Sequence, residues 1–187
     1  TEDVLARFCG RDAALLFSSG FAANIGLFAA LSGQDDVLFS DSLNHASIID
    51  GMRLSKAKRV VYLHQDHKDL ETKLRETSCT GQKFIVTESV FSMDGDISDL
   101  AQIVEIAQRN NALVIVDEAH STGLYGKRGS GIVERDGLEK AVLCSMHTGG
   151  KALGVGGAWI AGDKPLISHL VNHARSFIYS TAPIPAL

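Results

Sequence analysis

The sequence predicts an α/β fold in three layers (αβα), with a mostly parallel sheet between two layers of helices. The first reason is that short runs of β-branched and aliphatic residues alternate with longer segments of helical period, which is the pattern of a βαβ protein. The second is that residues 113–116, Leu-Val-Ile-Val, are apolar at every position, as expected for a strand covered by helices on both faces. No internal repeat or low-complexity linker interrupts the pattern, so a single domain is expected.

Each element has its own local signal. A short amphipathic helix at residues 3–8 is closed by Gly10, and the next helix follows a turn with a serine cap at Ser19. The helix at residues 100–109 has the clearest pattern, an apolar stripe at the three-four spacing of a buried helix face. The predicted strands are residues 14–18, 37–40, 59–63, 84–87, 113–116, 142–145 and 158–161. The predicted helices are residues 3–8, 22–31, 46–54, 68–75, 100–109 and 166–174.

Composition and charge exclude several classes of protein. The chain has 187 residues, 45% of them hydrophobic and 21% charged, so it is neither disordered nor fibrous. Its net charge of −4 provides no basic field for nucleic acid or an anionic membrane, and no apolar run approaches the roughly 18 residues of a membrane span. Three separated cysteines without C-x-x-C spacing favour a reducing, cytoplasmic location over a disulfide framework.

Polar clusters follow the predicted strands where those strands end. They are residues 18–20, 41–45, 88–96, 117–120 and 146–151. The carboxyl ends of parallel strands lie at one edge of a sheet, where ligands bind in open α/β folds. The sequence therefore predicts one site built from all five clusters.

The chemistry of these clusters suggests a pyridoxal-phosphate site. Lys151 lies in a Gly-rich turn among small residues, where loss of solvation lowers the pKa of an amine and suits it to Schiff-base chemistry. Asp117 can hold a pyridinium nitrogen protonated, and the helix start after Ser19 can bind a phosphate. Each signal alone also has an ordinary structural explanation, an exposed lysine or a capped turn. It is their combination at one edge that favours the cofactor.

The residues at 117–120 and two pairs of histidines also allow other interpretations. The run Asp-Glu-Ala-His at residues 117–120 also occurs at the magnesium-binding strand of DEAH-type nucleotide hydrolases, but no G-x-x-x-x-G-K-[ST] phosphate loop is present, so this stays a minor alternative. The pairs His64 with His67 and His169 with His173 have spacings that can hold zinc, but neither has a patterned third ligand. Solvated helix faces are favoured for both pairs, and no metal site is predicted.

Five stretches carry a resemblance to a known family. Residues 19–24, 44–51, 90–96, 117–123 and 148–154 match, in order and spacing, the α-oxoamine synthases, a family of fold-type-I pyridoxal-phosphate enzymes, and the chain resembles this family along its whole length. Members are about twice as long as this chain. The resemblance implies that residues 1–187 form the large cofactor-binding domain, truncated at both ends, with the N-terminal arm and C-terminal small domain outside the sequence.

The resemblance also implies roles for residues around the cofactor ring. Lys151 would carry pyridoxal phosphate as a Schiff base and then act as the base for the substrate's α-proton. Asp117 would pair with the pyridinium nitrogen, and His45 would stack on the ring. Ser92 and His120 would bind the phenolic oxygen. The catalytic residues expected are therefore Lys151, His45 and Asp117.

Further residues would hold the phosphate. The amides of Gly20 and Phe21 and the hydroxyl of Thr148 would bind it within one subunit. Ser180 and Thr181 match the segment that reaches the phosphate of the partner subunit, which implies a homodimer with shared active sites.

The family reaction condenses an amino acid with an acyl thioester, on CoA or a carrier protein, and loses carbon dioxide. Residues 90–96 and 174–181 most resemble members that use L-alanine and a pimeloyl thioester in biotin biosynthesis, whereas residues 44–53 are equally similar to members that acetylate glycine. The pair of L-alanine and a pimeloyl thioester is favoured. An inactive relative that serves only as a dimerisation scaffold is a further alternative.

Overall fold

The computed structural model describes residues 1–182 and contains a seven-stranded sheet within them. The strands are β1 (Ala13–Phe17), β2 (Val37–Asp41), β3 (Lys58–Tyr62), β4 (Lys83–Glu88), β5 (Ala112–Asp117), β6 (Cys144–Thr148) and β7 (Ala158–Gly162). The helices are α1 (Glu2–Phe8), α2 (Gly20–Leu31), α3 (Ala46–Leu54), α4 (His67–Glu76), α5 (Leu100–Arg109), α6 (Ile132–Arg135), α7 (Lys164–His173) and α8 (Arg175–Ile178).

The sheet is mostly parallel, as predicted. Its strand order is β1-β7-β6-β5-β4-β2-β3, and only β7 runs against the others, since it pairs antiparallel with both β1 and β6. The carboxyl ends of β1, β2, β4, β5 and β6 consequently lie at one edge, and the polar segments that follow these strands meet there.

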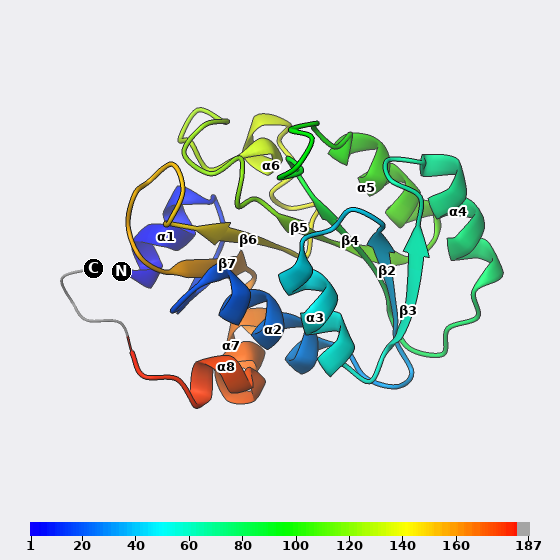
Figure 1. The fold of residues 1–187 in the computed structure, drawn as a ribbon, viewed down its shortest axis with the longest axis horizontal. Coiled ribbons are helices and arrows are strands. Elements are labelled where there is room, and N and C mark those ends of the chain that lie inside the picture. The colour runs from blue at the N-terminus through cyan, green and yellow to red at the C-terminus, as the bar shows by residue number, and fades with distance from the viewer. Residues whose placement is uncertain (183–187) are drawn as a thin grey trace.

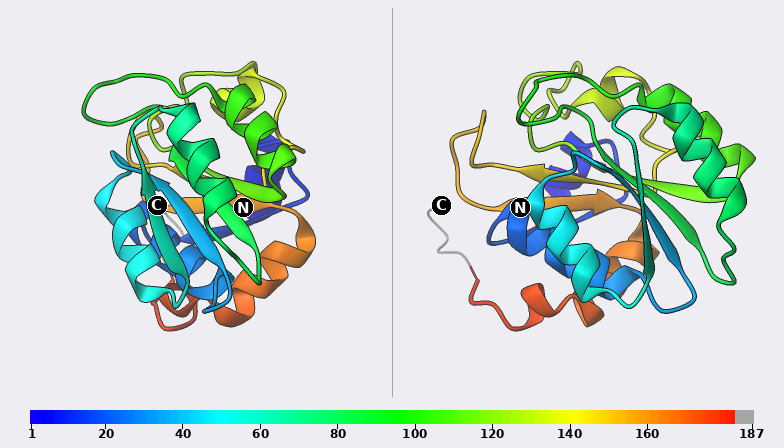
Figure 2. Two further views of the ribbon diagram at one scale, coloured as in Figure 1. Left: turned by 90° about the vertical axis from the view of Figure 1, so that its right-hand side faces the viewer. Right: turned by 45° about the vertical axis from the view of Figure 1, so that its right-hand side comes forward.

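Helices cover both faces of the sheet, which confirms the three predicted layers (Figure 1). Helices α2, α3, α7 and α8 lie on one face and α1, α4, α5 and α6 on the other, and the turned views show the sheet between them (Figure 2). Alternate residues of each strand point to opposite layers: in β5, Ile115 joins the core under α2 and α3, whereas Val114 and Val116 join the core under α4 and α5. Burial on both faces explains why residues 114–116 are apolar at every position, whereas Leu113, which was also predicted to be covered, is exposed.

Side-chain caps mark the starts of α2, α3, α4 and α5. Ser19 Oγ accepts a hydrogen bond from the amide of Ala22 at 3.1 Å, and Asp66 and Asp99 cap α4 and α5 in the same way. The cap of α3 is unusual, because the imidazole of His45 accepts from the amide of Ser47. The cap thereby fixes the orientation of a predicted site residue.

The predicted and observed elements differ mainly at β6. The sequence placed this strand at residues 142–145, but it spans Cys144–Thr148 and pairs with β7 as far as Thr148. The prediction ended too early because His147 is polar. In the fold this histidine is fully buried, stacks on Trp159 at 5.2 Å and bonds with Thr122 and Ser145. The short helices α6 and α8 were not predicted, since four residues carry too little periodicity.

Gly51 allows α3 to pack closely on α2, and we expect Gly51→Ala to destabilise the protein. A Cβ at this position would lie 2.7 Å from the backbone oxygen of Asn24 and 3.0 Å from Cδ2 of Phe28. Overpacking of this kind costs about 1–3 kcal/mol, more than the ~0.5–1 kcal/mol that alanine gains over glycine in a helix. Urea unfolding measures the difference. Gly33→Ala is the control, because its Cβ would meet only Asp36, at 3.9 Å. Equal midpoints for both variants would contradict the expectation.

Candidate functional site

A cavity of about 230 Å³ opens at the carboxyl edge of the sheet. Seven of the ten predicted site residues line it together: Gly20, Phe21, His45, Asp117, His120, Thr148 and Lys151. They come from the segments after β1, β2, β5 and β6, so the strand ends meet as the sequence pattern predicted. Ser47, Glu88, Ala119 and Met146 complete the lining.

Asp117 lies at the end of β5 and is almost fully buried. Its Oδ1 accepts a hydrogen bond from the amide of Ala119 at 2.9 Å, and its Oδ2 accepts from Nδ2 of Asn24 at 3.0 Å. Burial raises the pKa of Asp117 above its ordinary value, and the two hydrogen bonds only partly oppose this effect. A buried carboxylate whose hydrogen-bond donors are neutral is well suited to a cationic ligand group.

A chain of hydrogen bonds joins Asp117 to His45. Asn24 donates from Nδ2 both to Asp117 and to Ser47 Oγ, the latter at 2.9 Å, and Ser47 Oγ lies 2.8 Å from Nδ1 of His45. Since Nδ1 also accepts from the Ser47 amide, the proton of a neutral His45 is assigned to Nε2. The orientations of the Asp117 carboxylate and of the His45 ring both depend on this series of hydrogen bonds.

Sequence reasoning assigned no role to Asn24 or Ser47. A signal was present for Asn24, because it is the one strongly polar side chain in an otherwise apolar stretch of α2, and a buried amide requires hydrogen-bond partners. Ser47 had a weaker signal in its position two residues after His45, within the first turn of α3. Neither pattern revealed that Asp117, 93 residues from Asn24, was the partner.

Lys151 and His120 face each other across the cavity. Lys151 Nζ lies 2.8 Å from Nε2 of His120. Burial lowers the pKa of Lys151, against the charges of Asp117 and Glu88, which raise it. Burial also lowers the pKa of His120, and the positive charge of Lys151 lowers it further. The lowered pKa favours the neutral imidazole, whose Nε2 can accept a hydrogen bond from Nζ of Lys151.

Glu88 is the third ionisable group of the cavity wall. Its Oε1 accepts a hydrogen bond from the backbone amide of His45. Burial raises the pKa of Glu88 to about 8, with a smaller contribution from the charge of Asp117. The carboxyl group is thus mostly protonated at neutral pH.

This raised pKa predicts a pH dependence of stability. Glu88 binds a proton in the folded state up to about pH 8, whereas in the unfolded chain it loses the proton near the ordinary pKa of 4.5. Its contribution to the free energy of unfolding is therefore present below pH 4.5 and falls as pH rises towards 8, by up to about 1.4 kcal/mol per pH unit. We expect Glu88→Gln to lose this slope. The free energy of unfolding of the ligand-free wild type, minus that of the variant, should therefore fall between pH 5 and about pH 9. Glu76→Gln, on the exposed face of α4, is the control, and parallel pH profiles for all three proteins would refute the prediction.

The start of α2 provides a place for an anion. This helix begins at Gly20, so the first amide groups have no acceptor within the helix, and Gly20 and Phe21 both line the cavity. Thr148 lies opposite, at the end of β6. Helix N-termini with free amide groups bind phosphates, partly through the helix dipole.

Three predicted residues lie outside this cavity. Ser92 is exposed in the loop after β4 and is not part of the lining. Ser180 and Thr181 follow α8 and line a separate groove of about 280 Å³ with Ser18 and Phe177. Their roles stay predictions.

The second acid of the 117–120 run is not available to a ligand. Glu118 is fully buried, and its carboxylate accepts hydrogen bonds from Ser89 Oγ at 2.7 Å and from the amides of Ile132 and Val133 at 3.0 and 2.6 Å. It points away from the cavity and holds the start of α6. This placement argues against the nucleotide-hydrolase alternative, in which both acids would serve a metal.

Within residues 1–182, no group of three or more His, Cys, Asp or Glu side chains is placed to hold a metal ion. The described helices also include none with the length and apolar character needed to cross a bilayer.

Comparisons with known proteins agree with this geometry. The family model for aminotransferase class I and II matches residues 1–187. An 8-amino-7-oxononanoate synthase from Thermosipho melanesiensis is 49% identical over 99% of this chain and 47% of its own length, and a putative one from Bacillus licheniformis is 51% identical over 99% and 48%. The chain therefore spans about half the length of the relatives it matches.

Solved structures of similar proteins share the fold. Serine palmitoyltransferase from Sphingomonas wittichii superposes with a TM-score of 0.93 at 34% identity, over 97% of this chain and 45% of the other. The 8-amino-7-oxononanoate synthase from Francisella tularensis superposes with a TM-score of 0.84 at 37% identity, over 97% and 52%. These similarities confirm the predicted resemblance to the α-oxoamine synthases and the fold-type-I architecture. By its sequence, its sheet and its cavity, the chain belongs to the aminotransferase class I and II family.

Proposed function

We propose that this chain is the large, cofactor-binding domain of a pyridoxal-phosphate-dependent acyltransferase of the α-oxoamine synthase type. The observation that carries the proposal is the meeting of Lys151, Asp117, His45 and His120 around one cavity beside the start of α2. The similarity to 8-amino-7-oxononanoate synthases and to structures solved as SPT with PLP supports it.

The residues present fit the cofactor. A protonated ring nitrogen would supply the positive partner that buried Asp117 lacks, since both hydrogen-bond donors to its carboxylate are neutral. The phosphate would bind the first amides of α2, at Gly20 and Phe21, and the hydroxyl of Thr148. Lys151 offers a primary amine with a lowered pKa, which is the group that an aldehyde requires.

When bound, pyridoxal phosphate supplies an electron sink that stabilises negative charge at the α-carbon of an amino acid. The chain's own residues do the rest. Lys151 would hold the group through its amine, and Nζ, once released by the incoming amino group, would accept the α-proton. Its lowered pKa favours the neutral form of that amine. Asp117 would keep a proton on the ring nitrogen and His45 would pack on the ring, while His120 orients Lys151 through the contact at 2.8 Å.

For the substrates we favour L-alanine and a pimeloyl thioester, on CoA or a carrier protein, which would give 8-amino-7-oxononanoate in biotin biosynthesis. Support comes from relatives of that name at 45–51% identity. Glycine C-acetyltransferase, also called 2-amino-3-ketobutyrate CoA ligase, is the alternative, because residues 44–53 resemble it equally. The proposal includes a cytoplasmic homodimer in which Ser180 and Thr181 reach the partner's cofactor, with the N-terminal arm and small domain lying outside this sequence.

The test is a visible absorption spectrum of the intact protein before and after borohydride, followed by peptide mapping. Borohydride reduces the imine that joins cofactor and lysine, so we expect a stable pyridoxyl group on Lys151. Adding alanine or glycine to the unreduced protein, with each acyl-CoA, then decides the substrate pair by product formation. No chromophore in the presence of added pyridoxal phosphate would overturn the proposal and favour the inactive scaffold.

A further inference from the structure

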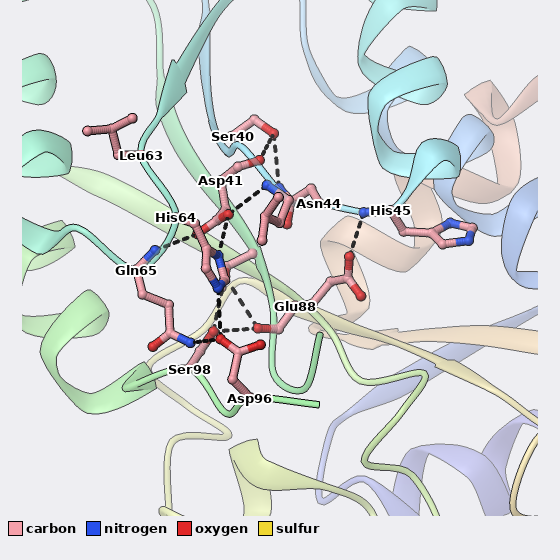
Figure 3. A network of polar contacts seen from close by, with 12 residues as sticks. Ser40, Asp41, Asn44, His45, Leu63, His64, Gln65, Glu88, Asp96 and Ser98 are labelled. Atoms are coloured by element: carbon pink, nitrogen blue, oxygen red, sulfur yellow. Dashed lines mark hydrogen bonds and ion pairs between the residues drawn. The ribbon is translucent and has the colours of Figure 1, made fainter. Parts of the chain in front are cut away.

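His64 joins two segments that lie far apart in the sequence. It follows β3, and its Nδ1 lies 2.9 Å from Oδ1 of Asp41 while its Nε2 lies 2.7 Å from Oδ2 of Asp96 (Figure 3). Asp41 is buried at the end of β2, and Asp96 belongs to the loop after β4. One imidazole thus connects three loops at the carboxyl edge of the sheet.

On one side, Asp41 holds the turn that leads into His45. Its Oδ1 accepts from the amide of Leu43 at 2.9 Å, and its backbone oxygen accepts from the amide of Asn44 at 3.2 Å. The next residue is His45, the cap of α3 and part of the cavity wall. A shift of the Asp41 side chain would therefore be passed directly to this wall.

On the other side, Asp96 closes the loop that contains Ser92. The backbone oxygen of Asp96 accepts from the amide of Phe91 at 3.0 Å, and a bridge between Val90 and Ile97 joins the ends of the loop. His64 packs edge-to-face against the buried ring of Phe91, with 4.5 Å between the ring centres. Ser92 is the next residue along the chain, so its position follows from that of Phe91.

The two segments converge again at Glu88. Its carboxyl oxygen accepts from the His45 amide, and its backbone oxygen accepts from Ser98 Oγ at 2.6 Å, just beyond the loop (Figure 3). His64 and Glu88 thus link the same two segments, with Glu88 in the cavity wall and His64 outside it.

We propose that His64 is a positioning residue, which holds the turn bearing His45 and the loop bearing Ser92 in register at the cofactor site. The proposal rests on the proposed function for the roles of His45 and Ser92. It adds a residue that lies outside the cavity and acts through Asp41, Asp96 and Phe91.

A histidine is specifically suited to this place. Only a protonated imidazole donates hydrogen bonds from two atoms on opposite sides of one rigid ring. Burial by itself lowers the pKa of His64, but the hydrogen bonds to Asp41 and Asp96, together with their charges, outweigh it and raise the pKa above its ordinary value. Glutamine has a single amide nitrogen and no charge, so it cannot serve both carboxylates equally.

The test compares His64→Gln with His173→Gln in the intact protein. The matched control is His173, an exposed residue of α7 whose one hydrogen bond within residues 1–182 goes to a carbonyl of its own helix, at 2.9 Å, and whose ring stacks on that of His169. Hydrogen exchange of the ligand-free proteins is measured at the amides of Phe91, Gly95 and Ser98, which are hydrogen-bonded within and beside the loop. The visible circular dichroism of bound pyridoxal phosphate and its dissociation constant are measured next.

We expect exchange of these amides to be about tenfold faster in His64→Gln. We also expect a weaker dichroic band and cofactor affinity lower by at least about fivefold, as for loss of one ordinary hydrogen bond. The control should match the wild type in all three measurements. The band reports the asymmetry of the ring's surroundings, which a purely structural role of His64 would leave unchanged once the cofactor is bound.

Three results would overturn the inference while leaving the proposed function intact. The first is that the wild type forms the Lys151 adduct and that His64→Gln matches it in hydrogen exchange, dichroism and cofactor affinity. Faster exchange without any change in dichroism or affinity is the second, because the loop would then be held without positioning the site. If His64→Gln does not fold, Asp96→Asn is tested instead, because it removes the charge of only one of the two carboxylates that contact His64. The third result is that this variant behaves like the wild type in all three measurements. Failure of the wild type itself to form the adduct refutes the proposed function.

Discussion

Replacement of Lys151 by alanine is expected to abolish covalent attachment of pyridoxal phosphate and to reduce kcat/KM by about 10⁴-fold or more. The residue has two proposed tasks, as the amine that holds the cofactor and as the base that accepts the α-proton. Nζ faces His120 at 2.8 Å, and no second lysine lines the cavity in the described part of the chain. Borohydride reduction with peptide mapping measures the attachment, and steady-state kinetics of the intact protein with alanine and pimeloyl-CoA measure the rate.

Lys140→Ala is the matched control, because Lys140 is exposed after α6 and does not line the cavity. It should keep the wild-type spectrum and rate. Urea unfolding of both variants in ligand-free form should give the stability of the ligand-free wild type, since Lys151 lies in a surface turn and truncation of its side chain leaves no core cavity. A pyridoxyl group recovered on another lysine of the wild type would contradict the assignment of Lys151.

The second large effect is expected for Asp117→Asn, with a loss in kcat of about 10²–10³-fold. The variant keeps the size of the side chain and an oxygen that can accept from Asn24 or Ala119, but it loses the negative charge. Without that charge nothing keeps a proton on the cofactor's ring nitrogen, and the electron sink is weakened. Kinetics of the intact protein measure the loss, with Asp12→Asn, on the exposed turn before β1, as the control.

The stability of the same variant separates a chemical role from a structural one. Burial raises the pKa of Asp117, so ionising this carboxylate in the ligand-free fold costs free energy. Asp117→Asn should therefore leave the ligand-free protein at least as stable as the wild type above the ordinary pKa of aspartate. A loss of stability together with the loss of activity would mean that Asp117 mainly supports the fold.

Much of the architecture could be predicted from local pattern. Helices α3 and α5 have the bounds that the sequence predicted, 46–54 and 100–109, because their helical periodicity lies within the segment itself. The convergence of the clusters after β2, β5 and β6 was also predictable, since parallel strands place their carboxyl ends at one edge. Strand β6 was misplaced because its polar His147 finds its partners in other segments.

By itself, then, the sequence determined the fold class, the edge of the sheet that carries the site, and seven residues that line the cavity. Only the tertiary structure decided which polar groups meet: Asn24 with Asp117 across 93 positions, and His64 between Asp41 and Asp96 across 23 and 32. The physical reason is the sequence separation over which each interaction acts. Helix caps and hydrophobic periodicity involve residues a few positions apart and can be recognised in the sequence, whereas the partner of a buried polar group depends on how distant segments pack.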